Sequence, residues 1–221
     1  MMLFAGGIDN VANGALILSV GAALLYLFAL EQPVSWRRSA VKTLAVALLA
    51  VVAAKQGGPL ALVGALGLSA VGDFMLSRDG DRWFLAGLFS FLLAHVAYIA
   101  LFVSYGAGVS AAFDPWRLIV AALMAALSSG ILVKVLPRLD QGMKAPVVAY
   151  AAAILLMGLS ALTMAGSFVV AGAALFMASD MLLAWERFIE PERSPRNGAM
   201  RIGVWLFYFA AQMLIVLAFV G

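Results

Sequence analysis

The feature that most constrains this chain is a succession of long apolar segments separated by short polar ones. Eight segments of roughly 16–22 residues follow one another, about the length that crosses a bilayer as a helix. They cover residues 11–30, 39–54, 60–77, 83–104, 116–136, 144–163, 167–185 and 199–220. With 65% hydrophobic residues and a mean hydropathy of +1.07 over 221 residues, a water-soluble domain could not bury this surface. The sequence therefore predicts an all-α polytopic membrane protein, a single transmembrane domain over residues 1–221 with eight transmembrane helices.

The basic residues predict how these helices are oriented, because cytoplasmic loops are enriched in Lys and Arg. No Lys or Arg precedes Arg37, so we expect no cleavable signal peptide and a retained first segment. With the N-terminus outside, only Lys55 and Arg117 face outward. The cytoplasmic side then holds the other twelve: Arg37, Arg38, Lys42, Arg78, Arg82, Lys134, Arg138, Lys144, Arg187, Arg193, Arg196 and Arg201. Both termini are therefore predicted to be non-cytoplasmic.

Two carboxylates stand inside apolar segments, in stretches that resemble each other. Asp73 lies in LSAVGDFML at 68–76 and Asp180 in LFMASDMLLA at 175–184, 107 positions apart. A carboxylate in an apolar membrane helix is costly and usually functional. The predicted topology places both Asp residues in the cytoplasmic half, each on the third helix of a four-helix half. This arrangement predicts a parallel 4+4 internal repeat.

The two Asp residues allow two interpretations. Each could pair with a nearby arginine at the lipid head groups, Asp73 with Arg78 and Asp180 with Arg187. Alternatively, the two face each other in a partly dry cavity. Two carboxyl groups in different surroundings can then serve as one acid and one base near neutral pH.

Polar residues on other segments could join this site. His95 and Tyr98 share one helix face, as do Tyr208 and Gln212. For these four and for Tyr150, hydrogen bonding between helices is about as plausible as a site role. Lys42 could extend to the head groups or contact a lipid phosphate. The absence of cysteine and the single histidine exclude thiolate zinc sites and multi-histidine metal sites.

These motifs resemble those of the YhhN-like lysoplasmalogenases from Lys42 to Gln212. The motifs are Lys42-Thr43-Leu44, Gly72-Asp73, Gly87 through His95-x-x-Tyr98, Tyr150 with Met157, Ser179-Asp180-x-x-Leu183-Ala184, and Tyr208-x-x-x-Gln212. Thr43 departs from the family, in which Pro or Cys often follows the lysine.

The resemblance implies hydrolysis of the vinyl ether bond of a lysoplasmalogen, a single-chain lysophospholipid. The products would be a fatty aldehyde and glycerophosphoethanolamine or glycerophosphocholine. It implies location in the bacterial inner (cytoplasmic) membrane among membrane lipids, with no metal, organic cofactor or nucleic acid. The catalytic residues would be Asp73 and Asp180, with Asp180 favoured as acid. The substrate-binding residues would be Lys42, His95, Tyr98, Tyr150, Ser179, Tyr208 and Gln212.

Three rival functions fit the same sequence. Paired intramembrane carboxylates and a two-half repeat are also typical of a proton-coupled transporter of small molecules or lipids. A non-catalytic membrane assembly partner would tolerate substitution of both Asp residues. A hydrolase of a related ether or ester lysolipid would share the site but not the substrate.

Overall fold

The computed structural model describes residues 4–5, 7, 10–191 and 194–221 and confirms the all-α prediction. Over these residues it contains eight α-helices, two short 3-10 helices and no strand. The α-helices are α1 Val11–Ala29, α2 Trp36–Lys55, α3 Leu60–Leu76, α4 Asp81–Tyr105, α5 Pro115–Val135, α6 Gln141–Ala161, α7 Ser167–Phe188 and α8 Asn197–Val220, and the 3-10 helices are η2 Val109–Phe113 and η3 Leu136–Arg138.

Each predicted segment corresponds to one α-helix, with ends that differ by a few residues. The largest differences at helix starts are at α2 and α6, which begin three residues before the predicted segments. At α2 the cause is a cap, because the Ser35 side chain accepts a hydrogen bond from the backbone N–H of Arg38 at 3.3 Å. A hydrophobicity pattern does not detect a helix turn made of Trp-Arg-Arg.

Six of these helices are long and apolar enough to cross a membrane, namely α1, α4, α5, α6, α7 and α8. The protein is therefore a multi-pass membrane protein. Helix α3 has only 17 residues, and α2 carries Arg37, Arg38 and Lys42. Both pack between other helices, and side chains such as Leu49 and Leu66 are fully buried. A helix that other helices shield from lipid can keep charged groups and still cross a membrane. We therefore keep the prediction that α2 and α3 span the membrane as well.

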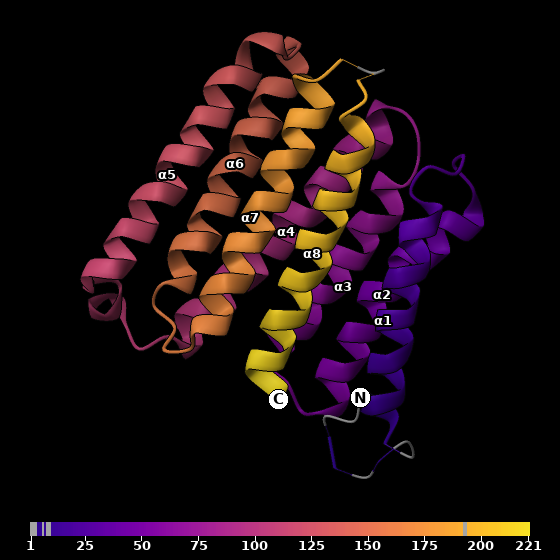
Figure 1. Cartoon of the computed structure of the whole chain (residues 1–221). Helices are drawn as coiled ribbons and strands as arrows, with labels where there is room; N and C mark the ends of the chain where they lie inside the picture. The colour runs from indigo at the N-terminus through magenta and orange to yellow at the C-terminus, as the bar shows by residue number, and fades with distance from the viewer. Residues whose placement is uncertain (1–3, 6, 8–9, 192–193) are drawn as a thin grey trace.

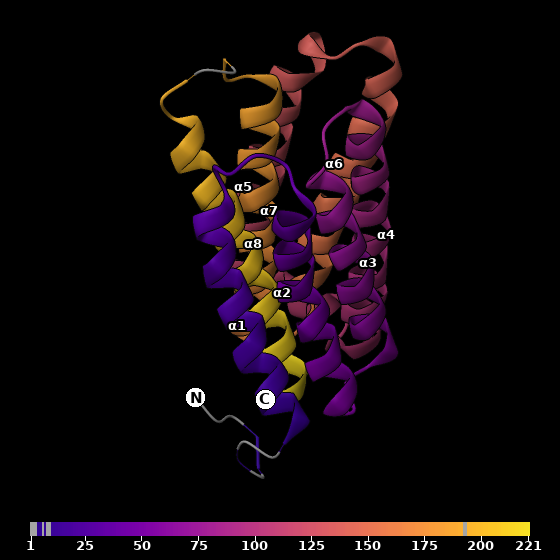
Figure 2. The ribbon, with the colours of Figure 1, turned by 90° about the vertical axis from the view of Figure 1, so that its right-hand side faces the viewer.

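The helices run antiparallel to their sequence neighbours along the first half, α1 against α2, α2 against α3 and α3 against α4 (Figure 1). The chain then crosses over, because α4 packs against α6 and α8 packs against both α7 and α2. Helix α5 lies at the edge of the bundle, and of its side chains only those of Arg117, Met124 and Val135 are buried (Figures 1 and 2).

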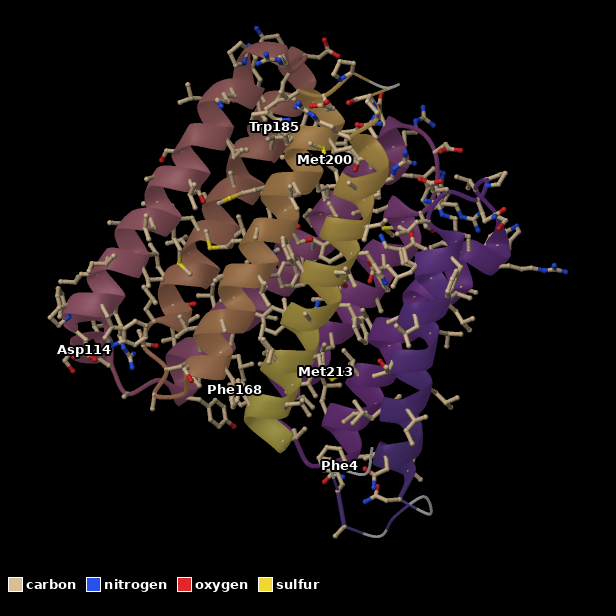
Figure 3. All side chains as sticks on the ribbon, in the orientation of Figure 1. Phe4, Asp114, Phe168, Trp185, Met200 and Met213 are labelled. Atoms are coloured by element: carbon tan, nitrogen blue, oxygen red, sulfur yellow. The ribbon has the colours of Figure 1, made fainter. Side chains whose placement is uncertain are left out.

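One end of the bundle carries the connections α1–α2, α3–α4, α5–α6 and α7–α8, and we call it the basic end (Figure 1). Nitrogen-tipped side chains gather there, near Trp185 and Met200 (Figure 3). The C-terminus and the first turn of α1 lie at the opposite end. Of the basic residues predicted on this side, Arg193 falls outside the described residues.

Candidate active site

Asp73 lies in the last turn of α3 and is almost completely buried, with 1% of its surface exposed. Its Oδ1 is 3.1 Å from Lys42 Nζ on α2. Its Oδ2 accepts a hydrogen bond from the Tyr208 hydroxyl on α8 at 2.7 Å. Asp73 therefore has one cationic and one neutral partner, and both carboxylate oxygens are satisfied.

Asp180 lies in α7 and has different partners. Its Oδ2 accepts a hydrogen bond from the Tyr150 hydroxyl on α6 at 2.6 Å. His95 Nε2 on α4 is 3.7 Å from the same oxygen. No lysine or arginine pairs with Asp180 among the described residues. The interpretation that Asp180 pairs with Arg187 is therefore wrong. Arg187 Nη2 lies 3.0 Å from Asp81 Oδ1 instead.

The His95 ring has its tautomer set by the backbone. Its Nδ1 lies 2.6 Å from the carbonyl oxygen of Phe91, an acceptor, so Nδ1 carries a proton. In the neutral ring, Nε2 then presents its lone pair toward Asp180. Nε2 is buried and has no hydrogen-bond partner in the described part of the chain.

The two carboxylates receive their partners from corresponding helices of the two predicted halves. Each Asp is contacted by the second helix of its own half, through Lys42 or Tyr150. Each is also contacted by the fourth helix of the other half, through Tyr208 or His95. Lys42 precedes Asp73 by 31 positions and Tyr150 precedes Asp180 by 30. The two sets differ in residue type at both positions, with Lys42 against Tyr150 on the second helices and Tyr208 against His95 on the fourth.

A polar cavity of about 480 Å³ connects these groups to the basic end. Of the predicted site residues, it is lined by Lys42, Asp73, Ser179, Asp180 and Tyr208. Both carboxylates thus line one cavity. Ser179 also fixes α7 against α8, because its Oγ donates a hydrogen bond to the Val204 carbonyl oxygen at 2.9 Å.

The remaining predicted site residues lie behind this cavity. Tyr150 lines a neighbouring groove, with its hydroxyl directed at Asp180. His95, Tyr98 and Gln212 are fully buried and line neither space. The Tyr98 hydroxyl donates a hydrogen bond to Gln212 Oε1, which joins α4 to α8. Tyr98 and Gln212 therefore hold the two helices that carry His95 and Tyr208.

The mouth of the cavity contains two arginines that were not among the predicted site residues, Arg38 and Arg78. Arg78 is not the partner of Asp73, because its guanidinium lies 3.6 Å from the ring centroid of Trp36. Arg38 donates a hydrogen bond to the Gln32 carbonyl oxygen at 3.2 Å. The buried Nε of Arg38 and Nη2 of Arg78 have no hydrogen-bond partner in the described residues. Their helix-end positions gave the only sequence signal, and it did not separate them from other basic residues.

The mouth also carries negative charge. Arg201 Nε lies 3.3 Å from Glu186 Oε1, which neutralises one such group. In the α7–α8 connection, hydrogen bonds from Ser194 Oγ at 2.5 Å and Trp185 Nε1 at 3.2 Å lower the pKa of Glu190. Glu190 is therefore an anion at neutral pH. The same cavity is thus lined by guanidinium nitrogens without hydrogen-bond partners and by the Glu190 carboxylate.

No group of three or more potential metal ligands is found in the described ranges. The site combines carboxylate, tyrosine, lysine and histidine groups, all of which can donate or accept protons. What the cavity can do chemically is donate a proton from one carboxyl group and accept one at the other.

Comparison with known proteins identifies related chains. The model of the YhhN family matches residues 37–219. A lysoplasmalogenase of Mycobacterium bovis is 34% identical over 162 residues, which cover 72% of this chain and 59% of the relative. The human lysoplasmalogenase TMEM86B is 32% identical over 192 residues, 85% of this chain and 77% of the relative, and the mouse protein is 32% identical over 206 residues, 91% and 83%.

These matches have clear limits in coverage. The chain spans 59% of the length of the mycobacterial relatives. No solved structure matches it significantly. The family model, however, extends from the start of α2 almost to the end of α8 and so includes every predicted site residue. The chain therefore belongs to the YhhN family.

Proposed function

We propose that this protein is a lysoplasmalogenase that hydrolyses the vinyl ether bond of a lysoplasmalogen within the membrane. The observation that carries the proposal is the pair of differently partnered carboxylates, Asp73 and Asp180, in one cavity of a membrane protein. Support comes from the relatives, which are named lysoplasmalogenases. The products would be a fatty aldehyde and glycerophosphoethanolamine or glycerophosphocholine.

The reaction needs an acid and then a base. Protonation of the β carbon of the enol ether gives an oxocarbenium ion. Water adds to the cationic carbon and loses a proton, and the resulting hemiacetal breaks its C–O bond to release aldehyde and the glycerol hydroxyl. Two carboxyl groups divide related work in glycoside hydrolysis, which also proceeds through an oxocarbenium-like state.

The partners of the carboxylates support a division of roles. Lys42 favours the ionised form of Asp73, because a buried carboxylate beside an ammonium group is a charge-assisted pair. Asp73 would then stabilise the cation and accept the proton of water. Asp180 has no lysine or arginine partner among the described residues, and the lone pair of His95 Nε2 lies 3.7 Å from its Oδ2. Asp180 would be the acid.

The other predicted residues have supporting roles in this proposal. Tyr150 and Tyr208 orient the two carboxylates, Ser179 positions the turn before Asp180, and Tyr98 and Gln212 hold α4 to α8. Lys42 remains within reach of the cavity for a lipid phosphate while it pairs with Asp73. A zwitterionic head group suits the mouth, where Arg38 and Arg78 could meet phosphate and Glu190 the amine.

We also propose the bacterial inner membrane as the location, with eight spans, both termini outside the cytoplasm and a 4+4 parallel repeat. The basic end would then face the cytoplasm. The packing of α4 on α6 and of α8 on α2 supports the repeat, because exchange of the two halves converts one contact into the other.

Substitution of the carboxylates tests the function. Asp73→Asn and Asp180→Asn should each lower aldehyde release from a purified lysoplasmalogen by roughly 100-fold or more, because each removes a proton-transfer group. Asp140→Asn, an exposed residue at the start of α6, is the matched control and should keep full activity. Full activity in either site variant would contradict the acid and base roles.

The transporter alternative is not favoured by the relatives, which are named as enzymes. The same purified preparation distinguishes the two functions. An enzyme releases aldehyde in detergent, without a membrane or a gradient. A protein that releases no aldehyde in detergent but moves substrate in proteoliposomes under a proton gradient would be a transporter.

A further inference from the structure

A second, almost wholly apolar space adjoins the polar cavity, between α4, α5, α6 and α7. Its walls include Leu88 of α4, Leu132 of α5, Ala151 of α6 and Met181 of α7. We call this space the apolar groove. Its volume is about 80 Å³, against about 480 Å³ for the polar cavity. The proposed reaction mechanism makes no use of it.

The apolar groove and the polar cavity meet at the acid. Phe84, Asp180 and Leu183 line both spaces, and Tyr150 lines the groove. A molecule that extended from one space into the other would therefore pass Asp180. Such a molecule needs one polar part and one apolar part.

The chemistry of the two spaces defines the occupant. The cavity mouth has unsatisfied guanidinium nitrogens on Arg38 and Arg78, which suit a phosphate group. The groove suits a hydrocarbon chain, because its walls are aliphatic and aromatic. In a 1-alkenyl lysophospholipid, the enol ether joins the hydrocarbon chain to the glycerol phosphate. The reactive bond thus lies at the junction of the two parts, as Asp180 lies at the junction of the two spaces.

We infer that the apolar groove is the binding site for the hydrocarbon chain of the substrate, with the head group in the polar cavity. This inference rests on the proposed function and deepens it. From Asp180, the hydrocarbon chain of the substrate runs between α5, α6 and α7 rather than toward α1 and α2. The first carbons of the hydrocarbon chain lie beside Asp180, and the later carbons fill the groove along α5.

A filled groove should change which chain lengths the enzyme accepts. Leu132→Trp should lower kcat/KM for a hexadecenyl lysolipid at least roughly tenfold more than for an octenyl one, the scale of selection by an apolar pocket. Val133→Trp is the control, because Val133 is next on α5, is 69% exposed and lies outside the groove. Equal loss for both chain lengths in Leu132→Trp, with the control unchanged, would overturn the inference.

A second pair of variants tests the groove from another helix, in case Leu132→Trp does not fold. Ala151→Phe narrows the groove from α6, whereas Ala152→Phe adds the same ring at the neighbouring exposed position. The same selective loss is expected in Ala151→Phe only. A long-chain preference identical in the two variants would contradict the assignment.

Photo-crosslinking tests where the hydrocarbon chain binds without a measurement of enzyme activity. The probe is a non-hydrolysable 1-alkyl lysophosphatidylethanolamine with a diazirine midway along its hydrocarbon chain. Adducts should form on groove residues such as Leu132 and Met181, and unlabelled lysolipid should compete them away. Adducts confined to outward-facing residues such as Leu127 and Val133 would overturn the inference. Groove labelling in a wild-type protein that releases no aldehyde would instead refute the proposed function and leave the binding site in place.

Discussion

At Asp73 and Asp180, one type of side chain meets two different sets of neighbours. Asp73 pairs with Lys42 and Tyr208, whereas Asp180 meets Tyr150 and His95. Two like residues in unlike surroundings are how proteins obtain an acid and a base from a single residue type. The lysine is therefore the residue on which the proposed division of roles depends.

Removal of the Lys42 charge should affect both stability and catalysis. In Lys42→Met, Asp73 is left buried without its counter-ion, and breaking a buried pair in this way costs about 3–5 kcal/mol. The variant should lower kcat by roughly 100-fold, since Asp73 would no longer be held as a base. Thermal unfolding in detergent and aldehyde release measure the two effects. Lys55→Met, at the exposed far end of α2, is the control.

A double variant separates the two effects of this substitution. Lys42→Met with Asp73→Asn removes both charges, so it should recover much of the unfolding temperature lost in the single variant. Its activity should remain as low as that of Asp73→Asn alone. If Lys42→Met unfolds at the wild-type temperature and keeps its kcat, the ion pair has no part in holding Asp73.

At the residue scale, the sequence predicts which side chains matter better than how they pair. An isolated carboxylate in an apolar run is conspicuous, so Asp73 and Asp180 could be identified directly. Their partners come from helices distant in sequence, and spacing along one helix cannot reveal them. Arg78 is close to Asp73 in sequence, yet it stacks on Trp36, because that ring comes from the start of α2.

At the element scale, the contact between α3 and α4 depends on small residues next to the site. A methyl group at Gly72 would lie 2.6 Å from Phe91 Cδ2, and one at Gly87 would lie 2.7 Å from Leu76 Cγ. Phe91 in turn packs edge-on against Tyr208 and offers its carbonyl oxygen to His95. Close approach of these two helices therefore sets the positions of groups around both carboxylates.

Gly72→Ala should consequently destabilise the protein and impair the site. Overpacking of this kind costs about 1–3 kcal/mol, because Phe91 has to move. Gly67→Ala on the same helix is the control, since nothing lies within 4 Å of its added methyl group. It should be neutral or slightly stabilising. Equal unfolding temperatures for the two variants in detergent would show that α3 and α4 accommodate the methyl group freely.

The helices themselves were predictable because membrane helices have a strong and simple signal. Long apolar runs, broken by clusters such as Arg78 to Arg82, located all eight α-helices. The signal says nothing of which helices touch. The packing of α4 on α6 and of α8 on α2, which brings the site together, depends on side-chain fit between segments far apart in sequence.

At the scale of the whole molecule, the two ends of the bundle differ in charge, and this difference predicts its orientation. Most of the Lys and Arg residues lie in the connections at the basic end or in the parts of the helices that adjoin them (Figure 3). The positive-inside rule places that end in the cytoplasm. The polar cavity would then open to the cytoplasmic leaflet, and head-group products would be released on that side.

Single-cysteine labelling tests this orientation and the number of spans, and the chain has no cysteine of its own. A membrane-impermeant maleimide applied to intact spheroplasts should label Gln56→Cys and Asp114→Cys, which lie in connections at the end opposite the basic end. Asp79→Cys and Asp140→Cys should react only after permeabilisation. If Asp114→Cys reacts but Gln56→Cys stays protected until permeabilisation, α2 and α3 do not cross the membrane. If all four positions show the reverse labelling, the protein has the opposite orientation, with the basic end outside the cytoplasm.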